Sequence, residues 1–100
     1  MSDAVEVSKG ECVRIQGTWT DEDGAIDLTG RTLSIVDSYP KALMGGTVTV
    51  TDGPAGEFEV FIPEALAVRM GSGRVNWIRV EMALPGGCPD TTPRIWIEVV

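Results

Sequence analysis

The stretch GTVTVTDGPAGEFEVFIP, residues Gly46–Pro63, decides the fold of this chain. Apolar and polar residues alternate on both sides of the central DGPAG segment, whose Gly, Pro and Asp residues favour a tight turn. A side-chain period of two is typical of a strand with one buried face. The stretch therefore predicts an antiparallel hairpin, and its inward-facing residues are Val48, Val50, Phe58, Val60 and Ile62.

The same alternation recurs in short segments that Gly, Pro and Asp separate. The further strands that it predicts are residues 4–7, 12–20, 31–38, 74–84 and 94–100. A short helix is expected at residues 63–70, because Pro63 suits a first helical position and Gly71 follows the last one. Residues 85–93 are expected to form a loop. Together these elements predict an all-β fold, an immunoglobulin-like antiparallel β-sandwich of about seven strands.

A length of 100 residues fits one β-sandwich domain, residues 1–100. Residues 1–3 are expected to be a flexible tail. Within the strand at 12–20, Gly17 falls on the same face as Val13, Ile15 and Trp19. A glycine on an apolar face predicts a β-bulge or a close neighbour on the opposing strand.

The composition excludes several classes of function. Fifteen acidic against eight basic residues give a net charge of −7, which disfavours binding to nucleic acid or to an anionic membrane surface. The sequence contains no histidine, so catalytic schemes that depend on an imidazole base are excluded. The N-terminal ten residues lack the basic and apolar regions of a signal peptide, which predicts a soluble chain made in a cytoplasm.

The loop WTDEDGAIDLTG, residues Trp19–Gly30, contains four carboxylates. Asp21, Asp23 and Asp27 are weak candidates for a calcium site, since carboxylates suit a hard cation, although their spacing does not match an EF-hand loop. A purely architectural turn is the favoured interpretation, in which Asp27 caps backbone N–H groups and Leu28 closes the end of the core. No metal or other cofactor is expected.

The other acidic residues do not predict catalysis. Glu57 and Glu59 lie two positions apart on one strand, so they share a solvated face, and nothing in the sequence indicates a cleft between two acids. The chain is therefore not expected to be an enzyme.

Three aromatic residues, Phe61, Trp77 and Trp96, fall opposite the predicted core face of their strands. Large aromatic residues in such positions are candidates for an interface with another protein or another copy of the chain. Cys12 and Cys88 are expected at opposite ends of the domain, which disfavours a disulfide within the chain. The favoured interpretation is that both thiols are free. The alternative is a disulfide between subunits, which makes Cys12 and Cys88 further interface candidates.

Two long motifs resemble a known group of proteins. TWTDEDGAIDLTGRTLSI (Thr18–Ile35) and GGTVTVTDGPAGEFEVFIPEALAVRMGSGRVNWIRVEM (Gly45–Met82) are similar to small β-sandwich structural proteins of tailed bacteriophages and prophages. Some resemble the N-terminal attachment domains of upper baseplate or tail-fibre proteins. The chain departs from their pattern at Val75 and Trp77, which stand where tyrosines are usual.

The resemblance implies a non-enzymatic virion component, made in the bacterial host cytoplasm. It implies a homo-oligomer or symmetric multicopy assembly that docks on other virion proteins of the tail, baseplate or collar, or decorates the capsid. Candidate contact residues then include the acidic segment 21–27 besides the aromatic residues. An alternative hypothesis is a free-standing immunoglobulin-like module that recognises a carbohydrate or a cell-surface protein.

Overall fold

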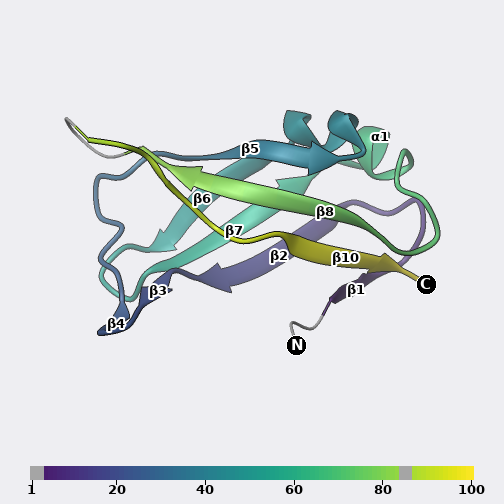
Figure 1. Cartoon of the computed structure of the whole chain (residues 1–100). Coiled ribbons are helices and arrows are strands. Elements are labelled where there is room, and N and C mark those ends of the chain that lie inside the picture. The colour runs from purple at the N-terminus through teal and green to yellow at the C-terminus, as the bar shows by residue number, and fades with distance from the viewer. Residues whose placement is uncertain (1–3, 84–86) are drawn as a thin grey trace.

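The hairpin predicted at residues 46–63 supplies two of the three strands of one sheet (Figure 1). Strand β6 (Thr47–Asp52) pairs antiparallel with β7 (Glu57–Ile62), and β7 pairs antiparallel with β2 (Val13–Thr18). The computed structural model describes residues 4–83 and 87–100.

The second sheet has β8 (Gly73–Met82) between two long neighbours. Strands β5 (Leu33–Tyr39) and β10 (Ile95–Val99) pair antiparallel with it, and β1 (Val5–Val7) adds parallel to the outer edge of β10. A two-residue strand, β9 (Asp90–Thr91), pairs with the end of β8. The order β1-β10-β8-β5, stacked on β2-β7-β6, is an immunoglobulin-like sandwich, so the predicted fold class is confirmed.

The core lies between the two sheets, where the predicted inward faces meet. Phe58, Val60 and Ile62 of β7 are buried, and Val48 and Val50 are half-buried against them. Buried partners from the other strands are Val13, Ile15, Leu33, Ile35, Ile78, Val80, Met82, Ile97 and Val99. Burial of these side chains is the main stabilisation of the fold, because apolar area removed from water contributes about 25 cal/mol per Å².

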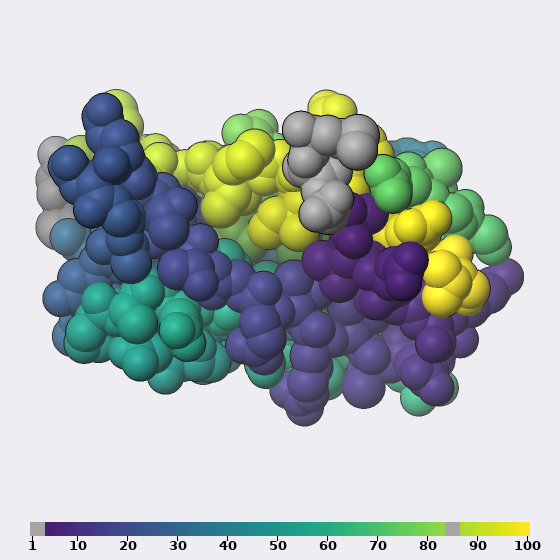
Figure 2. Space-filling view, turned by 90° about the horizontal axis from the view of Figure 1, so that it is seen from below, coloured from purple at the N-terminus to yellow at the C-terminus, as the bar shows by residue number. Residues whose placement is uncertain are grey.

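A third element stands apart from both sheets. Strands β3 (Thr20–Asp21) and β4 (Gly24–Ala25) form a small hairpin, which we call the acidic hairpin (residues 20–25). It projects at one end of the sandwich and is the dark blue protrusion in Figure 2. The 3₁₀-helix η1 (Lys41–Gly45) and the helical turn α1 (Glu64–Ala67) lie at the opposite end (Figure 1).

Several details differ from the sequence expectation. The helix expected at 63–70 is a single α-helical turn, and i→i+3 hydrogen bonds then carry the chain to Met70, which is buried. The pairing of β1 with β10 is parallel, and β9 lies inside the expected 85–93 loop. The expected flexible tail, residues 1–3, and residues 85 and 86 of that loop lie outside the described residues.

Candidate functional site

The outer face of the β1-β10-β8-β5 sheet carries three aromatic side chains in register. Trp77 of β8 is the cross-strand partner of Trp96 on one side and of Tyr39 on the other. Both tryptophans are half-buried, and 58% of Tyr39 is exposed. We call Tyr39, Trp77 and Trp96 the aromatic row. The sequence analysis identified the tryptophans but missed Tyr39, because only the strand pairing places it beside them.

Charged and apolar side chains surround the aromatic row. The guanidinium of Arg94 lies over the Trp77 ring, with 4.4 Å between its central carbon and the ring centroid, in a cation–π contact. Val75, two residues before Trp77, has 49% of its surface exposed. Arg74 lies 3.7 Å from a carboxylate oxygen of Glu98. The row is therefore an amphipathic surface with ordered aromatic rings, which is the character of many protein interfaces.

Phe61 does not belong to this surface. It lies on β7, where its cross-strand neighbours are Arg14 and Thr47, on the outer face of the other sheet. The Arg14 guanidinium lies 4.5 Å from the Phe61 ring centroid and also bonds Glu59, with 2.9 Å between nitrogen and oxygen. Gln16 donates a further hydrogen bond to Glu59. The interface candidates of the sequence analysis thus lie on two opposite faces.

Two of the three candidate calcium ligands, Asp21 and Asp27, stabilise turns of their own loop. Asp21 Oδ1 accepts the backbone N–H of Asp23, and Asp27 Oδ1 accepts that of Thr29, each at 2.8 Å. These bonds hold the pKa of Asp27 below its ordinary value, because the Thr29 side chain and then its N–H stabilise the carboxylate. Within residues 4–83 and 87–100, no group of three or more acidic or cysteine side chains is arranged to hold a metal ion.

The rest of the acidic loop closes one end of the core. Leu28 has no exposed surface, and its backbone N–H donates to the Gly53 carbonyl at 2.7 Å. Gly56, in the turn of the β6–β7 hairpin, accepts the N–H of Trp19 at 2.8 Å. Gly56 has a φ of +73°, and a Cβ there would lie 2.6 Å from the Ile26 carbonyl oxygen. The loop is therefore fixed by a glycine-containing turn that approaches it closely.

An open groove of about 450 Å³ runs between β2 and the segment that leads into β10. These two segments lie side by side in Figure 2. Trp19 forms part of the wall, and its indole Nε1 donates to Asp90 Oδ2 at 3.2 Å. Other polar lining residues are Gln16, Thr18, Thr20, Thr91 and Thr92. The groove exists because β1 covers only residues 97–99 of β10, so the sandwich stays open beside residues 93–96.

The η1/α1 end has a second concavity, which we call the end pocket, with a volume of about 490 Å³. Its lining residues include Tyr39, Lys41, Arg69, Val75 and Asn76. Asn76 is fully buried; it donates to the Gly71 carbonyl at 2.8 Å and accepts the Gly71 N–H at 2.9 Å. The sequence did contain a signal for this role of Asn76, because it is a single polar residue on the apolar face of the central strand β8.

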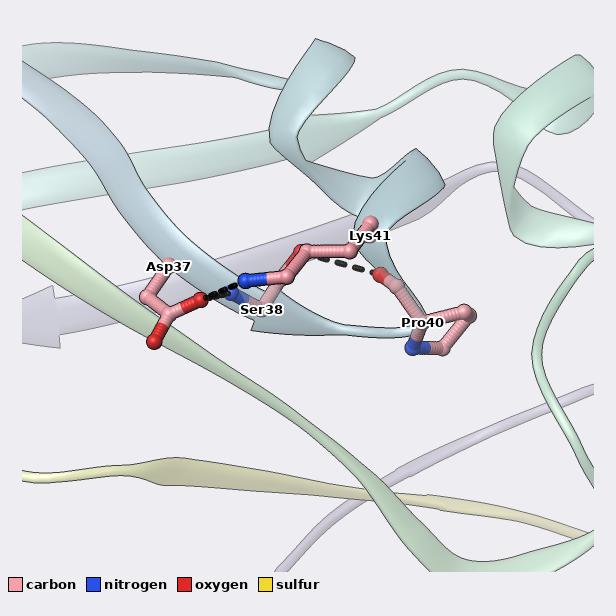
Figure 3. Close-up of polar contacts among 4 residues, drawn as sticks. All are labelled: Asp37, Ser38, Pro40 and Lys41. Carbon is pink, nitrogen blue, oxygen red and sulfur yellow. Dashed lines mark hydrogen bonds and ion pairs between the residues drawn. The ribbon is translucent and has the colours of Figure 1, made fainter.

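A polar network fixes η1 at the rim of the end pocket (Figure 3). Asp37 Oδ1 accepts hydrogen bonds from the Lys41 ammonium and from the Ser38 N–H, and the Ser38 hydroxyl donates to the Pro40 carbonyl at 2.9 Å. The Lys41 bond, followed by the Ser38 bond, holds the pKa of Asp37 below its ordinary value. Ser38 is buried because the register of β5 shifts between Ile35 and Asp37.

Cys12 and Cys88 are both exposed, and they form no disulfide with one another. Cys12 directly precedes β2, whose first residue pairs with Ile62, whereas Cys88 lies two residues before Asp90, which pairs with Met82. The two thiols therefore lie at opposite ends of the sandwich.

No helix of the described segments has the length and apolar character needed to span a bilayer. Comparison of the chain with models of protein families, with curated proteins and with solved structures found no match.

Proposed function

We propose that this chain is a non-enzymatic structural component of a tailed-phage virion, a docking module that is present in many copies. The proposal takes its biological setting from the resemblance of residues 18–35 and 45–82 to phage structural proteins. The module attaches to virion proteins of the tail, baseplate or collar, or decorates the capsid surface. In such assemblies each interface is repeated by symmetry, so that modest contacts sum to firm attachment.

The single observation that carries the docking role is the aromatic row. Tyr39, Trp77 and Trp96 stand side by side across three strands of one outer sheet face. Tryptophan and tyrosine dominate the binding energy of protein interfaces, because each ring offers a large apolar area at a low cost in conformational entropy. The antiparallel pairing of β8 with both neighbours places the three side chains next to one another on one face of the sheet.

Mass spectrometry of purified particles tests this function. Particles of the phage or prophage that encodes the chain are expected to contain it, with a copy number that matches the symmetry of a tail, collar or capsid element. Absence of the chain from intact particles contradicts the proposal. Neighbouring genes for terminase, portal and tape-measure proteins support the same setting.

A second candidate function is a free-standing module that recognises a carbohydrate. The groove between β2 and β10 favours it, because its threonine hydroxyls and the Asp90 carboxylate can hydrogen-bond sugar hydroxyls beside the edge of the largely buried Trp19. This function predicts binding of the purified chain to a glycan array, with loss of binding when Asp90 is replaced by Ala. It also predicts that the chain is absent from particles.

A further inference from the structure

The η1/α1 end of the sandwich carries most of the exposed large hydrophobic side chains of the described residues. Six large hydrophobic side chains are exposed among the described residues, and four of them belong to segments at this end. They are Tyr39 at 58%, Met44 at 41%, Val68 at 51% and Val75 at 49% exposure. Exposed apolar side chains gathered at one end of a small domain mark an interaction surface.

The end pocket adds positive charge to this apolar surface. Lys41 and Arg69 line it, and no carboxylate is among its described lining residues. Lys41 is paired with Asp37, whereas the structure gives Arg69 no carboxylate partner within residues 4–83 and 87–100. The pocket is also preformed, since Asn76 holds the Gly71 backbone through two hydrogen bonds. Such a pocket fits an acidic, hydrogen-bonding segment of a partner.

The acidic hairpin at the other end has the complementary character. Asp21, Glu22 and Asp23 place three carboxylates in succession at its tip, and all three residues are exposed. The Asp21 carboxylate accepts the Asp23 N–H, and Gly24 adopts a φ of +113°, so the tip has a defined turn. The hairpin projects from the body of the sandwich (Figures 1 and 2).

We infer that the end pocket receives the acidic hairpin of a second copy of this chain. Charge complementarity supports this occupant. The chain has a net charge of −7, yet the pocket at one end is lined by Lys41 and Arg69, and the carboxylate tip of a neighbouring copy can enter it. The inference rests on the proposed function for its setting, since a multicopy module needs a contact that repeats. Of the aromatic row, only Tyr39 lines the end pocket, so Trp77 and Trp96 stay available for the underlying virion protein.

The contact is heterologous, because the surface that one copy offers differs from the surface that it receives. Each added copy leaves one hairpin and one pocket open, so the copies form a head-to-tail row that either closes into a ring or continues. This consequence distinguishes the contact from a face-to-face dimer through the aromatic row, which ends at two copies.

Sedimentation velocity of the purified full-length chain tests the inference. The wild type is expected to form species larger than a dimer as its concentration rises toward about 1 mM, and to dissociate when salt screens the charges. Arg69→Gln and the double variant Glu22→Gln/Asp23→Asn are each expected to weaken association at least about tenfold. Lys9→Gln and Glu57→Gln are the matched controls, since they remove one charge of each sign outside the pocket and the hairpin.

A mixture of the two neutralised variants gives the sharpest readout. Arg69→Gln keeps an intact hairpin, and Glu22→Gln/Asp23→Asn keeps an intact pocket, so the mixture is expected to form a one-to-one dimer and nothing larger. Circular dichroism checks that both variants keep the fold. A wild type that stays monomeric up to about 1 mM, or association that neither variant weakens, overturns the inference.

These outcomes are separate from the test of the proposed function. A monomeric chain that is still present in particles removes the head-to-tail contact and leaves the virion role intact. Conversely, head-to-tail association of a chain that is absent from particles removes the virion role and leaves the contact intact. A monomeric chain that captures an acidic peptide in the end pocket also overturns the inference, because the occupant is then another protein.

Discussion

Gly17 of β2 and Phe58 of β7 are cross-strand partners, and the Phe58 ring lies directly against the glycine. A Cβ at position 17 would stand 2.6 Å from Phe58 Cζ, well inside van der Waals contact. The same ring packs against Trp19 in a tilted arrangement with 6.0 Å between centroids. One glycine thus makes room for the aromatic pair that closes this part of the core.

Replacement of Gly17 by Ala is expected to destabilise the fold by about 1–3 kcal/mol, because the added methyl group overpacks the core. Urea unfolding followed by tryptophan fluorescence measures the change. Gly87→Ala is the matched control, since a Cβ at position 87 meets nothing within 4 Å. Equal unfolding midpoints for the two variants contradict the prediction.

Leu28 is expected to be the most sensitive residue of the acidic loop. Its side chain has no exposed surface, so Leu28→Ala leaves a cavity and is expected to cost about 2–5 kcal/mol. The exposed Val68 provides a control, because Val68→Ala removes apolar atoms that water already contacts. The same unfolding assay compares them, and a small effect at Leu28 shows that the loop does not close the core.

Asn76 is expected to stabilise the connection between α1 and β8. Asn76→Leu keeps a similar volume but leaves the N–H and the carbonyl of Gly71 without their partner, which is expected to cost about 1–3 kcal/mol. Hydrogen exchange gives a local readout, since the Gly71 amide is expected to lose protection. Unchanged exchange at Gly71 contradicts this role.

The aromatic row is expected to be the docking surface. Trp96→Ser is expected to lower incorporation into particles at least about tenfold, the effect of losing about 1.4 kcal/mol or more at an interface. Phe61→Ser, on the opposite face, is expected to leave incorporation unchanged. Quantitative mass spectrometry of particles measures both, and equal losses show that the two substitutions act through folding.

Acid is expected to destabilise the protein through Asp27 and Asp37. Both carboxyls have a folded-state pKa below the ordinary value of 3.8, so each contributes stability above that value and loses it as pH falls through the lower folded-state pKa. Urea midpoints are therefore expected to fall below about pH 4. Asp27→Asn and Asp37→Asn are expected to flatten this decline, and an unchanged slope contradicts the assignment.

Local pattern predicted most of the fold because each strand carries its own signal. Alternation at 46–63 identified β6, β7 and their turn, and the same period predicted strands at 12–20, 31–38 and 74–84, where β2, β5 and β8 lie. The acidic loop was also predicted as a turn that Leu28 anchors, since Asp and Gly act on backbone within a few residues. These features depend on near neighbours in the sequence.

The sequence by itself therefore determined the two-layer sandwich, its core and the outward direction of Trp77 and Trp96. Only the tertiary structure decided that these tryptophans meet Tyr39 while Phe61 lies on the opposite face, because sheet order and register place strands that are distant in sequence. The groove beside β10 and the pairing of Lys41 and Arg69 in one pocket likewise depend on where separate segments end in space. The period of two along a strand determines whether a side chain points into the core or outward. The order and register of the strands determine which other side chains lie next to it.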